Sequence, residues 1–185
     1  MTLRTGTYTI GPGDSTLLLT TRREGAAAKM GHDLTLAAGR WSATVIVETD
    51  PAQSSVTATI DAASLEVRDA VGGAIPITDK QRAEVAANIR DKVLAVSKHP
   101  EISFHSTLIA GDDASAVVTG DLTIAGRTRP AQLELTVADD GEHIHGAATV
   151  AQTDYGIKPY SAMLGALKVS DRVHIEVNVR LSFPR

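Results

Sequence analysis

The chain has 185 residues, of which 43% are hydrophobic and 22% are charged, with a formal net charge of −4 at pH 7. This length fits one domain with a single core, and the acidic balance leaves no basic surplus to neutralise nucleic-acid phosphates or hold an anionic membrane surface. The absence of cysteine excludes disulfides, a thiol nucleophile and thiolate metal ligands.

The N-terminal residues enter a strand-like alternation at once and lack the apolar stretch that is typical of a secretory signal. No segment approaches the ~18 consecutive apolar residues that a membrane-spanning helix needs. We therefore expect a cytoplasmic protein without a transmembrane segment.

Short runs of alternating apolar and polar residues, separated by Gly, Pro and Asp, predict antiparallel strands along most of the chain. In chain order the predicted strands are Thr7–Ile10, Ser15–Arg22, Trp41–Thr49, Val56–Ala62, Ile102–Ile109, Val117–Ile124, Gln132–Val137, Ile144–Gln152 and Val173–Phe183. The last is the clearest, because its apolar side chains all share one face. Between residues 25 and 36, a run of three alanines fits either a helical turn or small residues on a sheet wall.

One segment breaks the strand pattern. Thr78 with Gln81 three residues later matches a helix capping box, and Val85, Ile89 and Val93 follow at near-helical spacing. These signals predict one amphipathic helix over 79–96. It either caps one end of the sheet or acts as a lid over a ligand entrance.

About eight strands, regular turns and one helix leave two architectures, an eight-stranded antiparallel barrel or a two-sheet sandwich. No repeat, low-complexity tract or linker indicates a second domain, so residues 1–185 are predicted to form a single domain. Aromatic residues make up only 3% of the chain. That composition fits a hollow barrel, and a tightly packed aliphatic core fits it equally well.

Several motifs, in order along nearly the whole chain, resemble those of the YceI-like family. The sequence KHPEISF at Lys98–Phe104 is similar to the family's Lys-Tyr-Pro-x-Ile-x-Phe signature. The stretch Gly120–Pro130 is similar to its Gly-Asp-Leu-Thr-Ile-x-Gly-x-Thr-x-Pro block. Shorter resemblances lie at Thr7–Ile10, Ala63–Asp69 and Asp154–Ile157.

The resemblance implies an all-β, mainly antiparallel fold, an extended eight-stranded lipocalin-like barrel with the helix near one end. It also implies a non-catalytic carrier without a cofactor, which holds a polyisoprenoid or a similar long-chain lipid in an apolar tunnel. The alternative is a barrel that is packed shut and serves as a protein-interaction or stress-related module without a lipid ligand. An enzyme is the third hypothesis, and a homodimer formed through edge strands is a further expectation.

The segment 154–167 is the best candidate for ligand contact, because it is apolar but too rich in Gly and Pro for a plain strand. It either lines the ligand or plugs the end of the barrel. His32 either contacts a lipid headgroup at the rim or is a hydrogen-bonded turn histidine. The residues predicted to contact ligand, some on fold analogy alone, are Leu19, Met30, His32, Leu94, Phe104, Tyr155, Ile157, Tyr160, Met163, Leu164 and Leu167.

Metal binding and catalysis have little support in the sequence. His143 and His145 share one strand face and, with Glu142 and His174, offer possible metal ligands, but a polar strand end explains them more simply. Neither a nucleophile elbow nor a phosphate-binding glycine loop occurs. We therefore predict no metal site and no catalytic residue.

Overall fold

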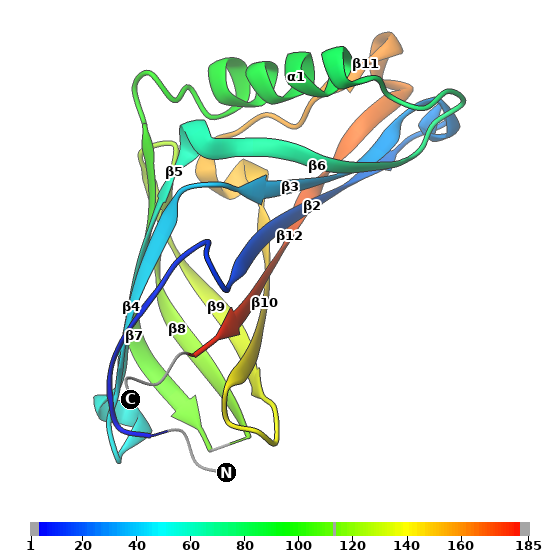
Figure 1. Cartoon of the computed structure of the whole chain (residues 1–185). Helices are drawn as coiled ribbons and strands as arrows, with labels where there is room; N and C mark the ends of the chain where they lie inside the picture. The colour runs from blue at the N-terminus through cyan, green and yellow to red at the C-terminus, as the bar shows by residue number, and fades with distance from the viewer. Residues whose placement is uncertain (1–3, 113, 182–185) are drawn as a thin grey trace.

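Hydrogen bonds join the strands into one antiparallel sheet that curls around an apolar interior, as the computed structural model shows for residues 4–112 and 114–181 (Figure 1). The strands are β1 (Gly6–Ile10), β2 (Thr16–Glu24), β3 (His32–Ala38), β4 (Trp41–Val47), β5 (Ser55–Asp61), β6 (Leu65–Gly72), β7 (Glu101–Gly111), β8 (Ser115–Ile124), β9 (Arg127–Val137), β10 (His143–Ala151), β11 (Ser161–Ala162) and β12 (Leu167–Arg180). Their order is β1-β4-β5-β7-β8-β9-β10-β12-β2-β3-β6, with β11 paired to β12.

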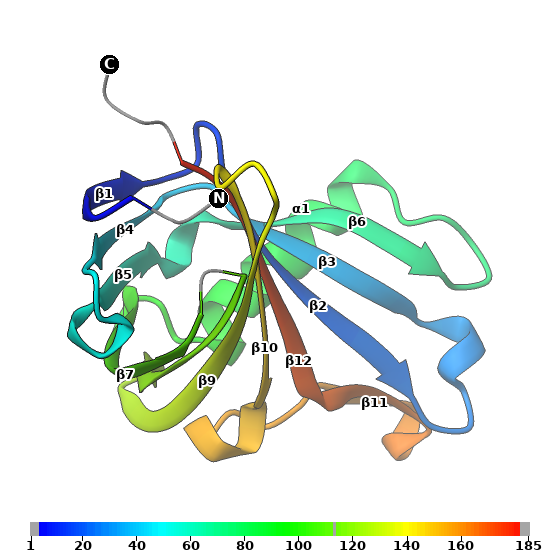
Figure 2. The same cartoon turned by 90° about the horizontal axis from the view of Figure 1, so that it is seen from below.

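The all-β, antiparallel, lipocalin-like fold with one helix is confirmed, although the described residues form a sheet of twelve strands rather than eight. Two long strands are each split at a corner. Only two residues separate β3 from β4, and one 3-10 turn, Ala62–Ser64, separates β5 from β6. Because β4 pairs with β5 and β3 pairs with β6, the ladder continues around the bend and the sheet forms a half-barrel (Figure 2).

Polar contacts fix this corner. The amide of Gly39 donates to the carbonyl of Ser64 (3.1 Å), and the amide of Asp61 donates to the carbonyl of Arg40 (3.0 Å). The Arg40 guanidinium also pairs with the Asp61 carboxylate, with 2.7 Å between Nη2 and Oδ2. The side-chain hydrogen bond from Arg40 is the main reason that the pKa of Asp61 is lowered.

Several boundaries differ from the predicted ones. β3 and β6 were not predicted as strands of their own, and β9 starts at Arg127 and runs through Pro130, where the sequence suggested a break. β12 starts six residues before the predicted Val173 and ends at Arg180. Phe183, the predicted end of that strand, lies outside the described residues.

The predicted helix is present as α1 (Asp79–Asn88), followed by a π-helical turn, Ile89–Val93. Its capping box is formed, since the amide of Gln81 donates to the Thr78 hydroxyl and the Thr78 amide donates to the Gln81 side chain. Ile89 and Val93 in this π turn pack against the core, and Leu94 directly after it is buried there. α1 lies beside β6 at the wide end of the curl (Figure 1).

No helix in residues 4–112 or 114–181 is both long and apolar enough to cross a membrane.

Candidate functional site

The concave face of the sheet is a continuous apolar surface. Ala43, Ala58, Phe104 and Leu122 are register partners on four consecutive strands and all belong to or pack against the core. On the opposite wall, Leu19 pairs with Leu36 and Ile175. These side chains share a face because residues directly opposite in a ladder point the same way.

Many of these inward residues are only partly buried. Leu17, Leu19, Phe104, Ile144 and Val177 pack against the buried core yet keep some accessible surface. The whole chain exposes 10763 Å², compared with about 8,500 Å² expected for a compact monomer of this size. An elongated, curled sheet with a partly accessible inner face accounts for the difference.

Trp41 lies in this interior core, with 8% of its surface exposed. It is the single tryptophan of the chain. Its indole N–H is buried and makes no hydrogen bond to any of the described residues. Trp41 is therefore a built-in fluorescent reporter of what enters the concave face.

The predicted ligand-contacting residues fall into three groups. Leu94, Tyr155 and Ile157 are buried in the core. A second group is half-buried and comprises Leu19, His32, Phe104 and Leu167. The third is exposed and comprises Met30, Tyr160, Met163 and Leu164. Their contact with a ligand stays a prediction.

The segment 154–167 is buried near its start, at Tyr155 and Ile157, and exposed further along, where it forms a rim. Tyr155, at the end of the 3-10 turn Gln152–Tyr155, is 3% exposed, and burial raises the pKa of its phenol, with the nearby Asp154 carboxylate adding to the effect. Further along, Met163 and Leu164 are exposed in the 3-10 turn Met163–Gly165, just before β12. The amide of Ala27 donates to the carbonyl of Ala166 (2.8 Å), which ties this rim to the turn that carries Met30.

His32 is engaged with the protein itself. Its Nε2 lies 3.0 Å from the carbonyl oxygen of Ile75, so the ring fastens β3 to the loop after β6. The neighbouring Asp33 accepts a hydrogen bond from the Arg23 amide (2.8 Å). This geometry corresponds to the hydrogen-bonded histidine of the two predicted roles, and a headgroup contact at His32 stays a prediction.

Leu164 is exposed in a strained backbone conformation, with φ 56° and ψ 31°, where L residues other than Gly, Asn and Asp are disfavoured. We expect Leu164→Asn to stabilise the protein by about 1 kcal/mol, which corresponds to a rise in Tm of about 2–4 °C. Thermal unfolding followed by circular dichroism measures the change. Ile75→Asn is the control, because Ile75 is also exposed but lies outside the left-handed region; an equal rise there would contradict strain as the cause.

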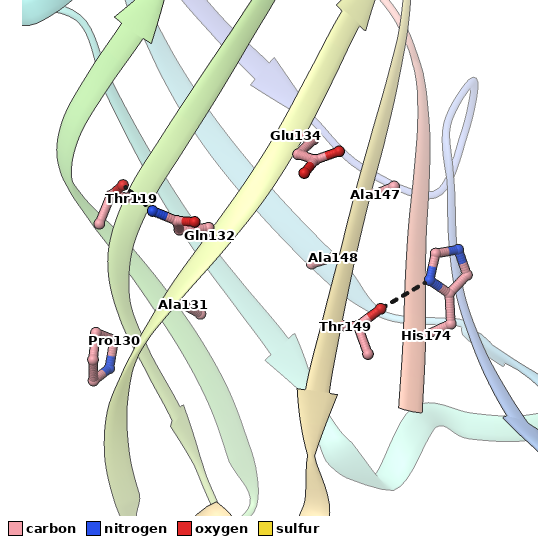
Figure 3. A pocket seen from close by; sticks show the side chains of 9 residues that line it. All are labelled: Thr119, Pro130, Ala131, Gln132, Glu134, Ala147, Ala148, Thr149 and His174. Carbon is pink, nitrogen blue, oxygen red and sulfur yellow. Dashed lines mark hydrogen bonds between the residues drawn. The ribbon is translucent and has the colours of Figure 1, made fainter. Parts of the chain in front are cut away.

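A lateral slot of about 560 Å³ opens in the sheet wall between β9 and β10 (Figure 3). Polar side chains line its outer part, and small alanines lie between them. The lining residues are Thr119, Pro130, Ala131, Gln132, Glu134, Ala147, Ala148, Thr149 and His174. Sequence reasoning did not find these residues as a group. Pro130, which was read as a break between strands, could have indicated a local edge, because proline cannot donate to a ladder.

The histidines considered as metal ligands contact other groups. His145 Nδ1 lies 3.0 Å from Asn178 Oδ1, and His174 lies between Thr149 and Glu176. His143 Nδ1 lies 2.6 Å from Asp140 Oδ2 in the turn between β9 and β10. Within the described ranges, no three or more His, Asp or Glu side chains are grouped closely enough to hold a metal ion.

The same turn predicts an acid-sensitive contribution to stability. Backbone hydrogen bonds from His143 and Glu142, and then the His143 side chain, lower the pKa of Asp140 from 3.8 to about 2. Because the folded-state pKa is depressed, the carboxylate stabilises the fold above pH 3.8, and this contribution is lost as the pH falls through about 2. Asp140→Ala should therefore lower Tm at pH 7, and its difference from the unaltered protein should shrink toward pH 2. Thermal unfolding across this range, with Asp139→Ala as the control, tests it; a constant difference would refute the linkage.

The curled sheet, the helix at its wide end and the accessible apolar concave face define a lipocalin-like half-barrel. A family model described as YceI-like domain matches residues 8–181. The chain therefore belongs to the YceI-like family.

Similar proteins agree with this assignment. A UPF0312 protein of Pseudomonas aeruginosa is 33% identical over 89 residues, which cover 43% of this chain and 47% of the relative. The chain thus spans about half the length of the curated relatives it matches. BcnA of Burkholderia cenocepacia superposes with a TM-score of 0.67 at 22% identity, covering 91% of this chain and 96% of BcnA. A polyisoprenoid binding domain from Saccharophagus degradans, implicated in plant cell wall breakdown, gives 0.60 at 12% identity, covering 97% and 100%. At these identities the two structures show a shared fold.

Proposed function

We propose that this protein is a non-catalytic binding protein that holds a polyisoprenoid or similar long-chain lipid against the concave face of its sheet. The observation that carries the proposal is the row of partly accessible apolar side chains on that face, including Leu19, Phe104 and Val177. Covering them with an apolar chain removes hydrocarbon surface from water, at roughly 25 cal/mol for each Å². The polyisoprenoid binding domain of S. degradans, which shares the fold, makes this ligand class the first to test.

In this proposal the exposed rim is the entrance. Met30, Met163 and Leu164 stand at the flared end of β2 and β12, where they would contact the lipid as it enters or leaves. Methionine suits such contacts because its side chain is flexible and adapts to an irregular hydrocarbon. Tyr155 and Ile157 are buried in the core cluster, where they would limit the space open to the lipid chain.

One observation supports a second function. The rim, together with Val71 and Ile75, exposes several large apolar side chains at one end of the molecule. Exposed apolar residues of this kind also mark protein-interaction surfaces. A packed interaction module would use the rim and leave the concave face empty of lipid.

A transport role, a cytoplasmic location and a homodimer remain predictions.

Native mass spectrometry of freshly purified protein, followed by organic extraction of the same sample, tests the two functions. A stoichiometric adduct that extracts as a long-chain isoprenoid or similar lipid supports the binding protein. An unliganded mass that does not change after incubation with quinones, prenyl alcohols or prenyl phosphates contradicts it and favours the interaction module.

A further inference from the structure

The lateral slot exists because β9 and β10 are hydrogen-bonded to each other over only part of their length. β9 and β10 pair only from Ile144↔Val137 to Ala147↔Glu134. Beyond that point β9 remains paired with β8 down to Arg127, and β10 remains paired with β12 up to Ala151. The slot therefore lies in the sheet wall where β9 and β10 are no longer paired with each other.

The slot is bounded at both ends by hydrogen-bonded structure. The ladder at Ala147 and Glu134 closes one of them. The turn Gln152–Tyr155 bounds the other, because Thr153 is held to the Asp171 carboxylate on β12 through its amide (2.9 Å) and its hydroxyl (2.7 Å). Just after this turn, Gly156 lies against the Arg127 side chain at the start of β9. The slot is therefore bounded at both ends, and no movement of the strands is needed to form it.

Two of the alanines that line the slot, Ala131 and Ala148, belong to the concave face of the sheet. Ala131 packs against the core cluster. Ala148 pairs with Ile175, which is also the partner of the inward residue Leu19, so Ala148 belongs to the inner face. Both alanines line the slot (Figure 3), and their small side chains put little bulk between its outer polar residues and the apolar interior.

The polar lining offers both donors and acceptors but only one formal charge. Gln132 and Thr119 lie on one side, with 3.5 Å between Gln132 Nε2 and Thr119 Oγ1. Thr149 lies on the other side, 3.3 Å from His174 Nδ1, and His174 Nε2 lies 3.2 Å from Glu176. Glu134 supplies a carboxylate, and no Lys or Arg is among the described residues that line the slot.

This chemistry favours an uncharged hydroxyl. A hydroxyl can donate to the Glu134 carboxylate and accept from the Gln132 amide, whereas a phosphate would face Glu134 without a lining cation. Arg127 and Arg129 also lie on β9, near Gly156 and Tyr155 respectively. They lie beyond one end of the slot and do not line it. They are the alternative anchor that an anionic headgroup would use.

We propose that the β9–β10 slot is a headgroup site that selects long-chain lipids with a neutral hydroxyl, such as a prenyl alcohol or a quinol, over lipids with a phosphate. This inference rests on the proposed function, because the hydrocarbon chain must occupy the concave face. Glu134 is the residue that sets the selectivity.

Titrating the protein with geranylgeraniol and with geranylgeranyl monophosphate, while following Trp41 emission, tests the proposal. The unaltered protein should bind the alcohol at least about tenfold more tightly than the monophosphate. Glu134→Gln should weaken the alcohol about threefold and strengthen the monophosphate about threefold. Glu66→Gln, which removes an exposed carboxylate from β6, should leave the preference unchanged.

The outcomes separate this inference from the proposed function. If both lipids change Trp41 emission with equal affinity, and Glu134→Gln leaves the ratio unchanged, the apolar chain binds but the slot is not the headgroup site. If the monophosphate binds more tightly and Arg129→Gln removes that advantage, the headgroup lies at the arginine end and the slot proposal is wrong. If neither lipid alters the emission nor forms an adduct in native mass spectrometry, both proposals fail.

Discussion

Gly120→Ala is expected to lower the melting temperature of this protein by about 6–12 °C. Gly120 is buried on β8, where an added Cβ would overlap the backbone carbonyl oxygen of His105 and lie 2.6 Å from Cζ of the Phe104 ring. The backbone cannot yield cheaply, because Ser106 and Gly120 pair beside a register shift in the β7–β8 ladder. Overpacking of this kind costs about 3 kcal/mol, and each kcal/mol lowers Tm by about 2–4 °C in a domain of this size.

Gly13→Ala is the matched control, because a Cβ at Gly13 meets no atom of the described residues within 4 Å. Thermal unfolding followed by circular dichroism should separate the two variants clearly. A similar small change in both would mean that the Phe104 ring and the β7 backbone adjust freely around Gly120. The prediction would then be wrong, together with the tight packing it assumes.

Local patterns in the sequence predicted most of the fold. Period-two alternation located all the long strands except β3 and β6, and Thr78 with Gln81 marked the start of the helix, since both signals depend on neighbours in sequence. The split of two strands at Gly39–Arg40 and Ala62–Ser64 was not predicted. A corner of this kind depends on cross-strand hydrogen bonds, such as that from Gly39 to Ser64, which no local pattern reveals.

The candidate site was less predictable than the fold. Alternation correctly assigned Leu19 and Phe104 to one face of their strands, but it could not tell a half-buried inward residue from a fully buried one. The slot was missed for a related reason. It arises where β9 and β10 stop pairing, and only Pro130, read as a break between strands, hinted at this edge.

The predicted loss of ligand binding is largest for Leu19→Lys. Leu19 is half-buried on the concave face between Leu36 and Ile175, so a lysine there places an ammonium group where the lipid chain is proposed to lie. Contact with hydrocarbon would strip water from that charge, which is strongly unfavourable. We expect affinity for geranylgeraniol to fall about 100-fold, equivalent to about 2.7 kcal/mol, as measured by Trp41 emission.

Leu18→Lys provides the comparison, because the same substitution one residue earlier points to the other face of β2. Leu18 pairs with Glu176, whose carboxylate can accept the new ammonium group, so lipid affinity should stay within about twofold of the unaltered protein. Circular dichroism must first show that both variants unfold cooperatively. Equal losses in the two would indicate general damage to the sheet, and unchanged binding in Leu19→Lys would exclude the concave face as the lipid site. Only a loss confined to Leu19 assigns binding to that face, because the two variants differ in the direction of one side chain.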